Sequence, residues 1–479
     1  MPVDLDSMFT TLSRQADAIP LATAEQARQR GRQRSRNRAV GISSTAVVCL
    51  VAVGATTMLT RPGPAPTPAA SPSPLSEFAP PLVFGEPVSE TLMVVIAERV
   101  YAALQLSNKV LVAGTDPAKQ ETWQLELAGV PGEKLADFRA VPQGLLVTAT
   151  STTQRPRLDV VDPMKGRSRW TRWLDEFEQV IPLPQALVLW SPTTGRTEAS
   201  DWTTGERRWA LDPAADPVVR TLGMRTADDP AADAYAGGTF VQVTKSGQVQ
   251  VRDAATGGLL RSTSIPAPSD ARTDVYDRRG QPTRRIPQQL MVAVDGRLYT
   301  TEVPCCDTAA YRVRVTDLSK DHGASAVVFS AGVGHSFSAL SVCGTDRLCV
   351  LDQDRVKGAT VAAVDVVKRR QLWRVAVPND ATTITSRAGR TLVSGTTNVV
   401  LDRDGSSAFR TGLPQADWLT DDTLVALPAG SPGSVVRVQI PDRQVRQVGN
   451  VPAHAGTCGH TTDVLVCSTE TGMQFYRLG

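Results

Sequence analysis

The chain is poor in histidine and in aromatic residues, and it lacks the short motifs of common hydrolases and nucleotide-dependent enzymes. Its 479 residues include four histidines, and Phe, Trp and Tyr together make up 5%. So few histidines leave a small supply of general bases that titrate near neutral pH. No Gly-x-Ser-x-Gly elbow, phosphate-binding loop or His-Glu-x-x-His pair occurs. We therefore predict a protein that is not an enzyme, with no catalytic residue and no cofactor.

The chain also lacks a large excess of charge of either sign, with a formal net charge of +3. Residues 1–38 carry seven arginines and four acidic residues, so the rest of the chain is neutral overall. A neutral chain lacks the basic footprint of a nucleic-acid-binding domain. We predict no nucleic-acid partner.

One apolar run is long enough to cross a membrane. No charged residue occurs from Val40 to Leu59, a length close to the roughly 20 residues that span a bilayer. Arginine occupies every second position from Arg28 to Arg38, and the positive-inside rule then places the N-terminus in the cytoplasm. We predict a cytoplasmic basic tail (1–38) and one transmembrane helix (39–60) in the cell membrane, with everything after it outside. A long, cleaved signal peptide is the alternative.

Proline dominates the segment after this run. Residues 61–81 combine Pro with Gly, Ala, Ser and Thr, a composition typical of a polyproline-type spacer. We predict that this linker lifts a folded domain, residues 82–479, away from the membrane.

An apolar stripe runs through the N-terminal tail. Leu5, Met8, Phe9, Leu12 and Ala16 are spaced as one face of a short helix. One interpretation is a helix that rests on the membrane, or a mostly disordered tail. The sharper hypothesis is a docking helix for a cytosolic regulator, with Met8, Phe9 and Leu12 as its contacts.

Beyond Leu82 the apolar residues recur with a period of two, in short runs broken by Gly, Asp, Asn and Pro, which predicts an all-β domain. The runs group into quartets at about 91–127, 135–174, 178–210, 219–265, 288–330, 336–376, 381–411 and 415–449. A triplet at 455–478 lacks a fourth strand, and the segment from Leu82 to Gly85 is a candidate to supply it. Two connecting segments, 211–236 and 266–287, are longer than the rest and are predicted as loops.

A turn motif recurs between the third and fourth strands of several quartets. In it an Asp accepts hydrogen bonds from turn amides, a Gly takes positive φ, and a Trp buries its ring. Two copies are complete: Asp162, Gly166 and Trp170, and Asp201, Gly205 and Trp209. Asp365 and Trp373 form a third copy with Arg369 in place of Gly, and Asp253 and Gly257 form a fourth with Arg261 in place of Trp.

This spacing resembles the tryptophan-docking motif of quinoprotein-like (PQQ-type) β-propellers, in which each Trp packs on the neighbouring blade. The resemblance implies a propeller of four-stranded blades. Related rings mostly close at seven or eight blades, so we predict eight, with seven or nine as alternatives. Propellers of this kind tether and organise cell-envelope proteins or bind extracellular ligands, and the motif itself serves the fold rather than chemistry.

Six cysteines follow the predicted membrane span, where disulfides persist. Cys343 and Cys349 lie on adjacent strands of one predicted hairpin, and Cys458 and Cys467 on those of another. We predict a disulfide within each pair. No zinc-ligand spacing accompanies them, and we predict no metal site.

The adjacent pair Cys305 and Cys306 has a counterpart in quinoprotein alcohol dehydrogenases, where such a pair lies against the quinone. The resemblance ends there, because neither a calcium site nor a catalytic base can be matched, and structural disulfides are the favoured interpretation. The segment from Leu401 to Gly405 has two aspartates at calcium-loop spacing, but we predict a plain turn.

These observations predict a single-pass membrane protein whose exported propeller is a non-enzymatic scaffold for an envelope protein or an extracellular ligand. A first alternative is a sensor whose cytosolic tail contacts a sigma factor or a kinase. A second is a degenerate quinoprotein oxidoreductase.

Overall fold

The computed structural model describes residues 74–479 apart from short gaps. The gaps are residues 97, 117–120, 130–131, 152–153, 176–177, 227–236, 269–271, 277–281, 288–289, 303–309, 355, 413–414, 428–432 and 452–456. The predicted tail with Met8, Phe9 and Leu12, the predicted membrane helix, most of the linker, and Cys305 and Cys306 thus lie outside the described residues. In the part described, no helix is long and apolar enough to cross a membrane.

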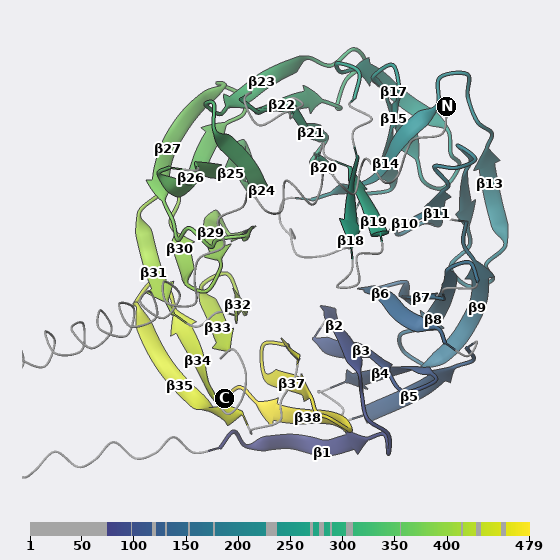
Figure 1. Cartoon of the computed structure of the whole chain (residues 1–479), viewed down its shortest axis with the longest axis vertical. Coiled ribbons are helices and arrows are strands. Elements are labelled where there is room, and N and C mark those ends of the chain that lie inside the picture. The colour runs from purple at the N-terminus through teal and green to yellow at the C-terminus, as the bar shows by residue number, and fades with distance from the viewer. Residues whose placement is uncertain are drawn as a thin grey trace, which may run out of the picture. The chain divides into compact units, whose positions relative to one another are not determined.

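Four-stranded antiparallel sheets follow one another around a ring (Figure 1). We number them blades 1–9 in chain order, with the first strand of each nearest the centre. Blades 1 to 5 are formed by β2 (Glu90–Ile96), β3 (Arg99–Gln105), β4 (Val110–Asp116) and β5 (Glu121–Leu127); β6 (Lys134–Val141), β7 (Gly144–Thr150), β8 (Arg157–Asp162) and β9 (Arg167–Trp173); β10 (Gln179–Pro182), β11 (Leu187–Trp190), β12 (Thr197–Ser200) and β13 (Arg207–Leu211); β14 (Val218–Arg225), β15 (Thr239–Thr244), β16 (Gln248–Asp253) and β17 (Leu259–Ser264); and β20 (Met291–Val294), β21 (Arg297–Glu302), β22 (Arg312–Asp317) and β23 (Ser325–Ser330).

The remaining blades continue the same order. They are formed by β24 (His335–Gly344), β25 (Arg347–Asp354), β26 (Gly358–Asp365) and β27 (Arg370–Ala376); β28 (Thr383–Arg387), β29 (Arg390–Ser394), β30 (Asn398–Leu401) and β31 (Ser407–Thr411); β32 (Gln415–Trp418), β33 (Thr423–Leu427), β34 (Gly433–Gln439) and β35 (Gln444–Val451); and β36 (Cys458–His460), β37 (Val464–Ser468) and β38 (Gly472–Arg477) with β1 (Glu77–Val83).

The described residues therefore form nine blades, and the predicted number of eight is wrong. The prediction discounted one quartet because related rings mostly close at seven or eight, whereas every quartet found in the sequence forms a sheet. Blade 9 takes its outermost strand from the start of the domain, since β1 pairs antiparallel with β38. That closing strand begins at Glu77, so residues 77–81, predicted as linker, belong to the propeller.

Apolar contacts between blades hold the ring together. Nine hydrophobic clusters occur among the described residues, one at each junction between neighbouring blades, including the junction of blade 9 with blade 1. The second and third strands of a blade lie between the neighbouring blades. In blade 3, for example, all residues of these strands, β11 and β12, are buried. Fourth strands are much more exposed, as in β13. Residues 72–479 form one compact unit that contains all nine clusters, so this part has the contacts it needs to fold by itself.

Blades 4 and 5 are joined more closely than the others. Their first strands, β14 and β20, pair in parallel and make one eight-stranded sheet. Between these blades the chain forms a separate hairpin of β18 (Arg272–Tyr276) and β19 (Pro282–Pro287). Both segments predicted as loops thus contain strands: β14 lies within 211–236, and the hairpin lies within 266–287.

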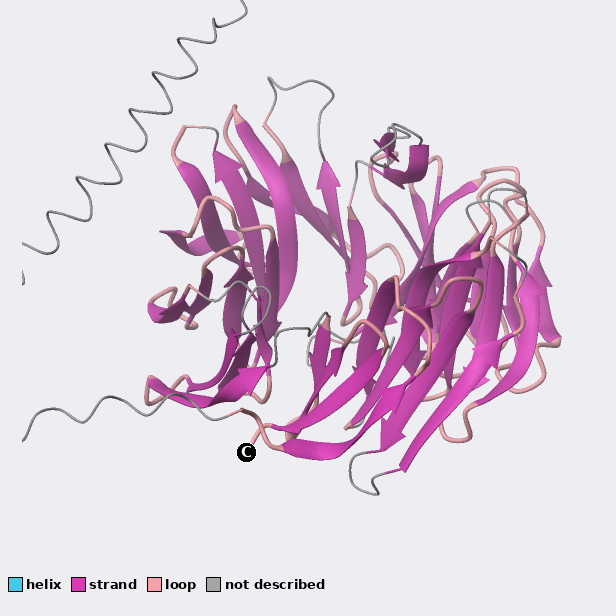
Figure 2. Cartoon of the chain, turned by 60° about the horizontal axis from the view of Figure 1, so that its bottom comes forward, coloured by secondary structure: helices cyan, strands magenta, loops and turns pink. Residues whose placement is uncertain are grey.

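Strand direction divides the turns between two faces of the ring. Because neighbouring strands are antiparallel, the turns between strands 1 and 2 and between strands 3 and 4 of a blade lie on one face, which we call the docking-turn face. The turns between strands 2 and 3 and the connections between blades lie on the opposite face (Figure 2). The chain enters the propeller on the docking-turn face, where the Arg477 amide donates to the Ser76 carbonyl at 2.9 Å.

Candidate functional site

Tryptophans on fourth strands reach to the next blade's turn between strands 3 and 4, which we call its docking turn. Their indole nitrogens donate to carbonyl oxygens of these turns: Trp170 to Trp202 at 3.1 Å, Trp209 to Ala254 at 3.0 Å, and Trp373 to Arg403 at 2.9 Å. The glycine of the turn lies directly under the ring. A Cβ on Gly205 would lie 2.8 Å from the ring of Trp170. The docking therefore requires glycine in the receiving blade.

The glycine of each docking turn leaves the space into which the tryptophan of the preceding blade packs. Gly166 lies under Trp123 in this way, with a φ of 56°. In blade 6 the same position is Arg369, which adopts a φ of 55°. The preceding fourth strand, β23, contains no Trp, so no ring needs the space that a side chain fills. This explains why the third copy of the motif departs from glycine.

Sequence reasoning missed two members of this set, Trp123 and Gly405. Trp123 follows Asp116 by seven positions rather than eight, and Gly405 follows Asp402 by three rather than four. Gly405 lies under Trp373. A search that paired each Trp with the next blade's turn, and allowed the spacing within the motif to differ by one residue, would have found both. The segment from Leu401 to Gly405, predicted as a plain turn, is the docking turn of blade 7.

The aspartate of the motif organises the turn itself. Asp201 Oδ1 accepts hydrogen bonds from the amides of Thr203 at 2.8 Å and Thr204 at 3.1 Å, and these bonds hold its pKa below the ordinary value of 3.8. Asp162 and Asp365 accept two turn amides in the same way. These residues thus have structural roles.

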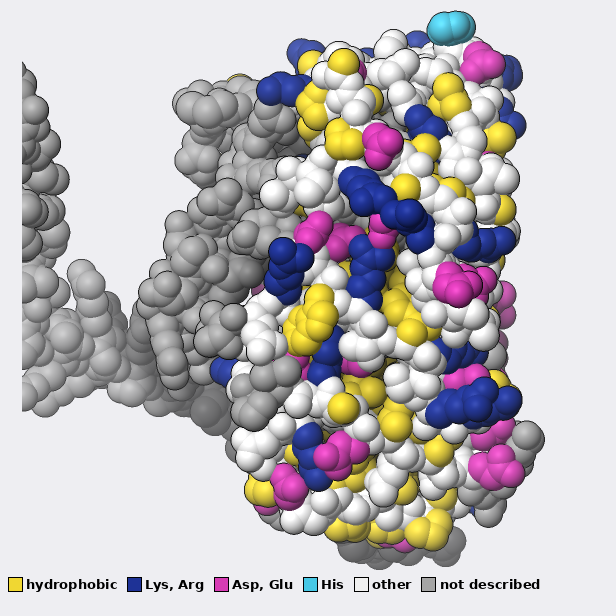
Figure 3. All heavy atoms as spheres, turned by 90° about the vertical axis from the view of Figure 1, so that its right-hand side faces the viewer, with side chains coloured by type: hydrophobic (Ala, Val, Ile, Leu, Met, Phe, Trp, Pro, Cys, Tyr) yellow, Lys and Arg dark blue, Asp and Glu magenta, His cyan; other side chains and the backbone are white. Residues whose placement is uncertain are grey.

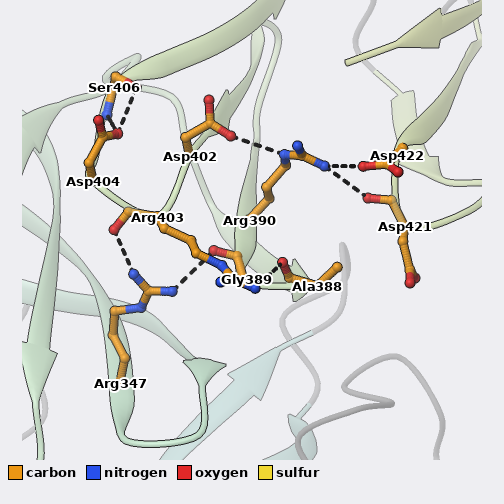
Figure 4. A network of polar contacts seen from close by, with 10 residues as sticks. All are labelled: Arg347, Ala388, Gly389, Arg390, Asp402, Arg403, Asp404, Ser406, Asp421 and Asp422. Carbon is orange, nitrogen blue, oxygen red and sulfur yellow. Dashed lines mark hydrogen bonds and ion pairs between the residues drawn. The ribbon is translucent and has the colours of Figure 1, made fainter. Parts of the chain in front are cut away.

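A cleft of about 620 Å³ opens on the docking-turn face between blades 7 and 8. It is the candidate site for a ligand, and Figure 4 shows all of its lining residues together with Arg347 and Gly389. Turns of both blades line it: Ala388, Arg390, Asp402, Arg403, Asp404, Ser406, Asp421 and Asp422.

Ion pairs fix the floor of this cleft. Arg390 bridges the two blades, because its guanidinium contacts Asp402 at 3.0 Å in blade 7 and also Asp422 in blade 8. The hydrogen bond from Arg390 to Asp422 raises the pKa of Arg390. Arg387 adds a second bridge to Asp421 at 2.8 Å. These pairs lock the two blades together at the position of the cleft.

The rim of the cleft is acidic and exposed. Asp421 keeps 66% of its side chain exposed. Asp404 accepts from the Ser406 hydroxyl at 2.7 Å and from its amide at 2.8 Å, and these bonds lower the pKa of Asp404. The lining contains four aspartates and only two basic residues, Arg390 and Arg403, so acidic side chains are in excess. It contains neither histidine nor cysteine. Such a cleft suits basic groups of a partner rather than nucleophilic or acid–base chemistry.

Blade 6 supports the cleft from the side. Arg347 donates to the carbonyl oxygens of Arg403 and Gly389, the second at 3.2 Å (Figure 4). It also donates to the carbonyl oxygen of Cys343 at 2.9 Å. Cys343 forms a disulfide with Cys349, as predicted, and the second predicted disulfide joins Cys458 with Cys467.

A buried polar cluster lies near the opposite face, between blades 5 and 6. Asp352 is wholly buried and is bonded by the Tyr311 hydroxyl at 2.9 Å, by His335 Nδ1 at 2.6 Å and by Arg374 at 2.5 Å. Burial raises the pKa of Tyr311. Tyr311 belongs to blade 5, whereas His335, Asp352 and Arg374 belong to blade 6, so the cluster cross-links the two blades. No group of three potential metal ligands occurs among the described side chains.

Comparison with known proteins found a matching family model and similar solved structures. Residues 108–328, which cover most of blades 1 to 5, match a PQQ-type repeat family described as "Outer membrane protein assembly factor BamB". No curated protein matches the chain. Similar solved structures include BamB from Moraxella catarrhalis, with 12% identity over 82% of this chain and 100% of that one (TM-score 0.41), and Sqt1 from Saccharomyces cerevisiae, with 12% identity over 80% and 100% (TM-score 0.42).

Proposed function

We propose that this β-propeller with PQQ-type repeats is a non-enzymatic scaffold that is anchored in the cell membrane and binds an envelope protein outside it. The matched family's description, an outer membrane protein assembly factor, supports a role in handling envelope proteins. A rigid ring that presents variable turns is well suited to such binding.

The observation that carries this proposal is the cleft between blades 7 and 8. Its ion pairs hold the floor in place before any partner arrives, so little conformational entropy is lost on binding. Asp404 is exposed, and Asp421 keeps 66% of its side chain exposed although it pairs with Arg387, so both carboxylates can accept a lysine or arginine side chain of the partner. The fitting partner is a basic extracytoplasmic loop of an envelope membrane protein.

The test is a pull-down of the full chain from detergent-solubilised native membranes, with captured proteins identified by mass spectrometry. The variant Asp404→Asn should weaken capture of the partner, because it removes an exposed carboxylate of the rim and leaves the ion pairs of Arg387 and Arg390 in place. Glu470→Gln, on the opposite face, is the matched control and should retain it. Equal capture by all three proteins would refute the cleft as the binding site.

A form that lacks residues 1–25 separates scaffold from sensor in the same experiment. A scaffold captures its envelope partner with or without these residues. Capture of a cytosolic regulator by the intact chain alone, lost again when Met8, Phe9 and Leu12 are replaced by charged residues, would favour the sensor hypothesis instead.

A further inference from the structure

We infer that the docking-turn face binds directly to the surface of a bilayer that contains anionic lipid. This goes beyond the proposed function, because it concerns contact between the propeller's own residues and lipid, with or without an anchor. Three independent features of the face support it: unpaired basic side chains, exposed apolar side chains beside them, and the point where the chain enters.

The docking turns carry basic side chains that are exposed and have no partner. Within the described part of the chain, no hydrogen bond or ion pair involves the following side chains: Lys165 and Arg167 in blade 2, Arg207 in blade 3, Arg369 in blade 6, and Arg443 in blade 8. Lys320 and Arg370 lie close enough to Asp317 and Asp365 to lower the pKa of those aspartates. Arginines on the inner turns of the same face are paired, as Arg99 is with Asp116 at 2.7 Å and Arg297 with Asp346 at 2.6 Å. The outer turns therefore present free positive charge.

Exposed apolar side chains accompany these cations. Met164 is 56% exposed at the tip of the blade 2 turn, and Val367 is 60% exposed in the blade 6 turn. Leu259, Leu260 and Val445, at the starts of the fourth strands of blades 4 and 8, are also exposed. Figure 3 shows the outer side of the ring near β9 and β13, where basic and acidic side chains both lie among apolar ones.

The turns of blades 2 and 6 combine both features most clearly. Residues 163–167 and 366–370 each contain an exposed apolar side chain and at least two cations. The aspartate that precedes each segment, Asp162 or Asp365, accepts two amides of its own turn, and Asp365 also pairs with Lys368 at 3.9 Å. The cations still outnumber the carboxylate in each turn. Apolar tips flanked by Lys and Arg are the chemistry that enters the headgroup region of an anionic bilayer. Because the blades lie on different sides of the ring, a flat surface can contact both turns at once (Figure 1).

The chain enters the propeller on this same face, at Ser76. The arginine-flanked apolar run of residues 40–59 precedes that point by fewer than 20 residues. If, as the sequence predicts, that run spans the membrane, the number of residues between Leu59 and Ser76 limits how far Ser76 can lie from the bilayer. The exposed carboxylates of the blade 7 and 8 cleft would then meet a loop of a membrane protein rather than lipid.

The experiment uses residues 72–479, which form a compact unit with all nine blade junctions. Binding is measured by flotation with protein-free vesicles of phosphatidylcholine alone and of phosphatidylcholine with phosphatidylglycerol. We expect binding to the anionic vesicles only, with a decrease as salt rises. Arg369→Glu should weaken the partition coefficient by at least about fivefold, since each cation contributes about that factor. Val367→Asp should weaken it as well.

The matched control is Arg312→Glu, an exposed arginine at the start of β22 on the opposite face, and it should bind as the unaltered unit does. Circular dichroism and thermal unfolding of each variant establish that it is folded. Absence of binding to anionic vesicles, or equal loss in Arg312→Glu and the blade 6 variant, would overturn the inference. The pull-down of the envelope partner is unaffected by either result, so the two proposals fail separately.

Discussion

Glu98 and Thr462 close the ring although they lie 364 positions apart. The Glu98 carboxylate in the first turn of blade 1 accepts from the Thr462 amide at 2.9 Å and from its hydroxyl at 2.8 Å in blade 9. The same junction contains a hydrophobic cluster to which residues from both ends of the domain contribute. The propeller is therefore closed by contacts between its termini rather than along the chain.

Because β1 completes blade 9 by pairing with β38, we predict that removal of β1 will destabilise the whole ring. A form that begins after Val83 exposes the edge of β38 and part of the cluster between blades 9 and 1. We expect a lower melting temperature, a broader transition and a tendency to aggregate. Thermal unfolding and size-exclusion chromatography measure these effects against a form that begins at residue 72. A truncated protein as stable as that control would contradict the role of β1.

Tryptophan docking predicts opposite effects of two substitutions at equivalent turn positions. Gly205→Ala places a Cβ against Trp170 and at a φ of 75°, so we expect it to lower the free energy of unfolding by about 1–3 kcal/mol. Arg369→Gly relieves a positive φ where no ring docks, so we expect no loss, or a gain of up to about 1 kcal/mol. Urea unfolding measures the free energy of unfolding of both variants. A clearly lower free energy of unfolding in Arg369→Gly would contradict this explanation of the turn.

The two disulfides close short loops within hairpins. Their sequence separations are 6 and 9 residues, for which chain entropy gives about 2 kcal/mol each. Replacing both partners of either bond by alanine should lower the free energy of unfolding by about that amount. The measurement is urea unfolding without reductant, and addition of reductant to the unaltered protein should reproduce the combined loss.

The docking-turn aspartates predict acid sensitivity. The pKa of Asp201 is lowered on folding, so its contribution to stability is fully present above the ordinary value of 3.8 and is lost as the pH falls below it. Asp201→Asn retains an oxygen acceptor but cannot titrate. We expect a shallower fall in the free energy of unfolding below about pH 4, measured by urea unfolding across pH, whereas Glu470→Gln should follow the unaltered protein.

The oxidoreductase alternative predicts ligand binding that the scaffold hypothesis does not. A propeller that held a quinone with calcium would melt at a higher temperature in their presence, by mass action. We expect no change in melting temperature and no dye reduction when residues 72–479 are given both. A concentration-dependent rise would restore the oxidoreductase hypothesis and direct attention to Cys305 and Cys306.

The local features of this protein could be predicted from its sequence. Strand positions, the turns around Asp162 and Asp201 and the two disulfides were predictable because each depends on residues close together in the chain. The ninth blade was also visible as a triplet that needed one more strand. The prediction of eight blades failed when the preference of related propellers was given more weight than the strands themselves.

The folded ring was needed to show which blade's tryptophan packs on each glycine, how the ring closes and where the charges lie. Gly205 is required by Trp170 of another blade, and no local pattern states that dependence. Composition shows a neutral domain, yet folding gathers free cations such as Arg369 on the outer docking turns and carboxylates such as Asp421 at the cleft between blades 7 and 8. The physical reason is that the blades place every docking turn on one face, so side chains distant in sequence share one electrostatic surface.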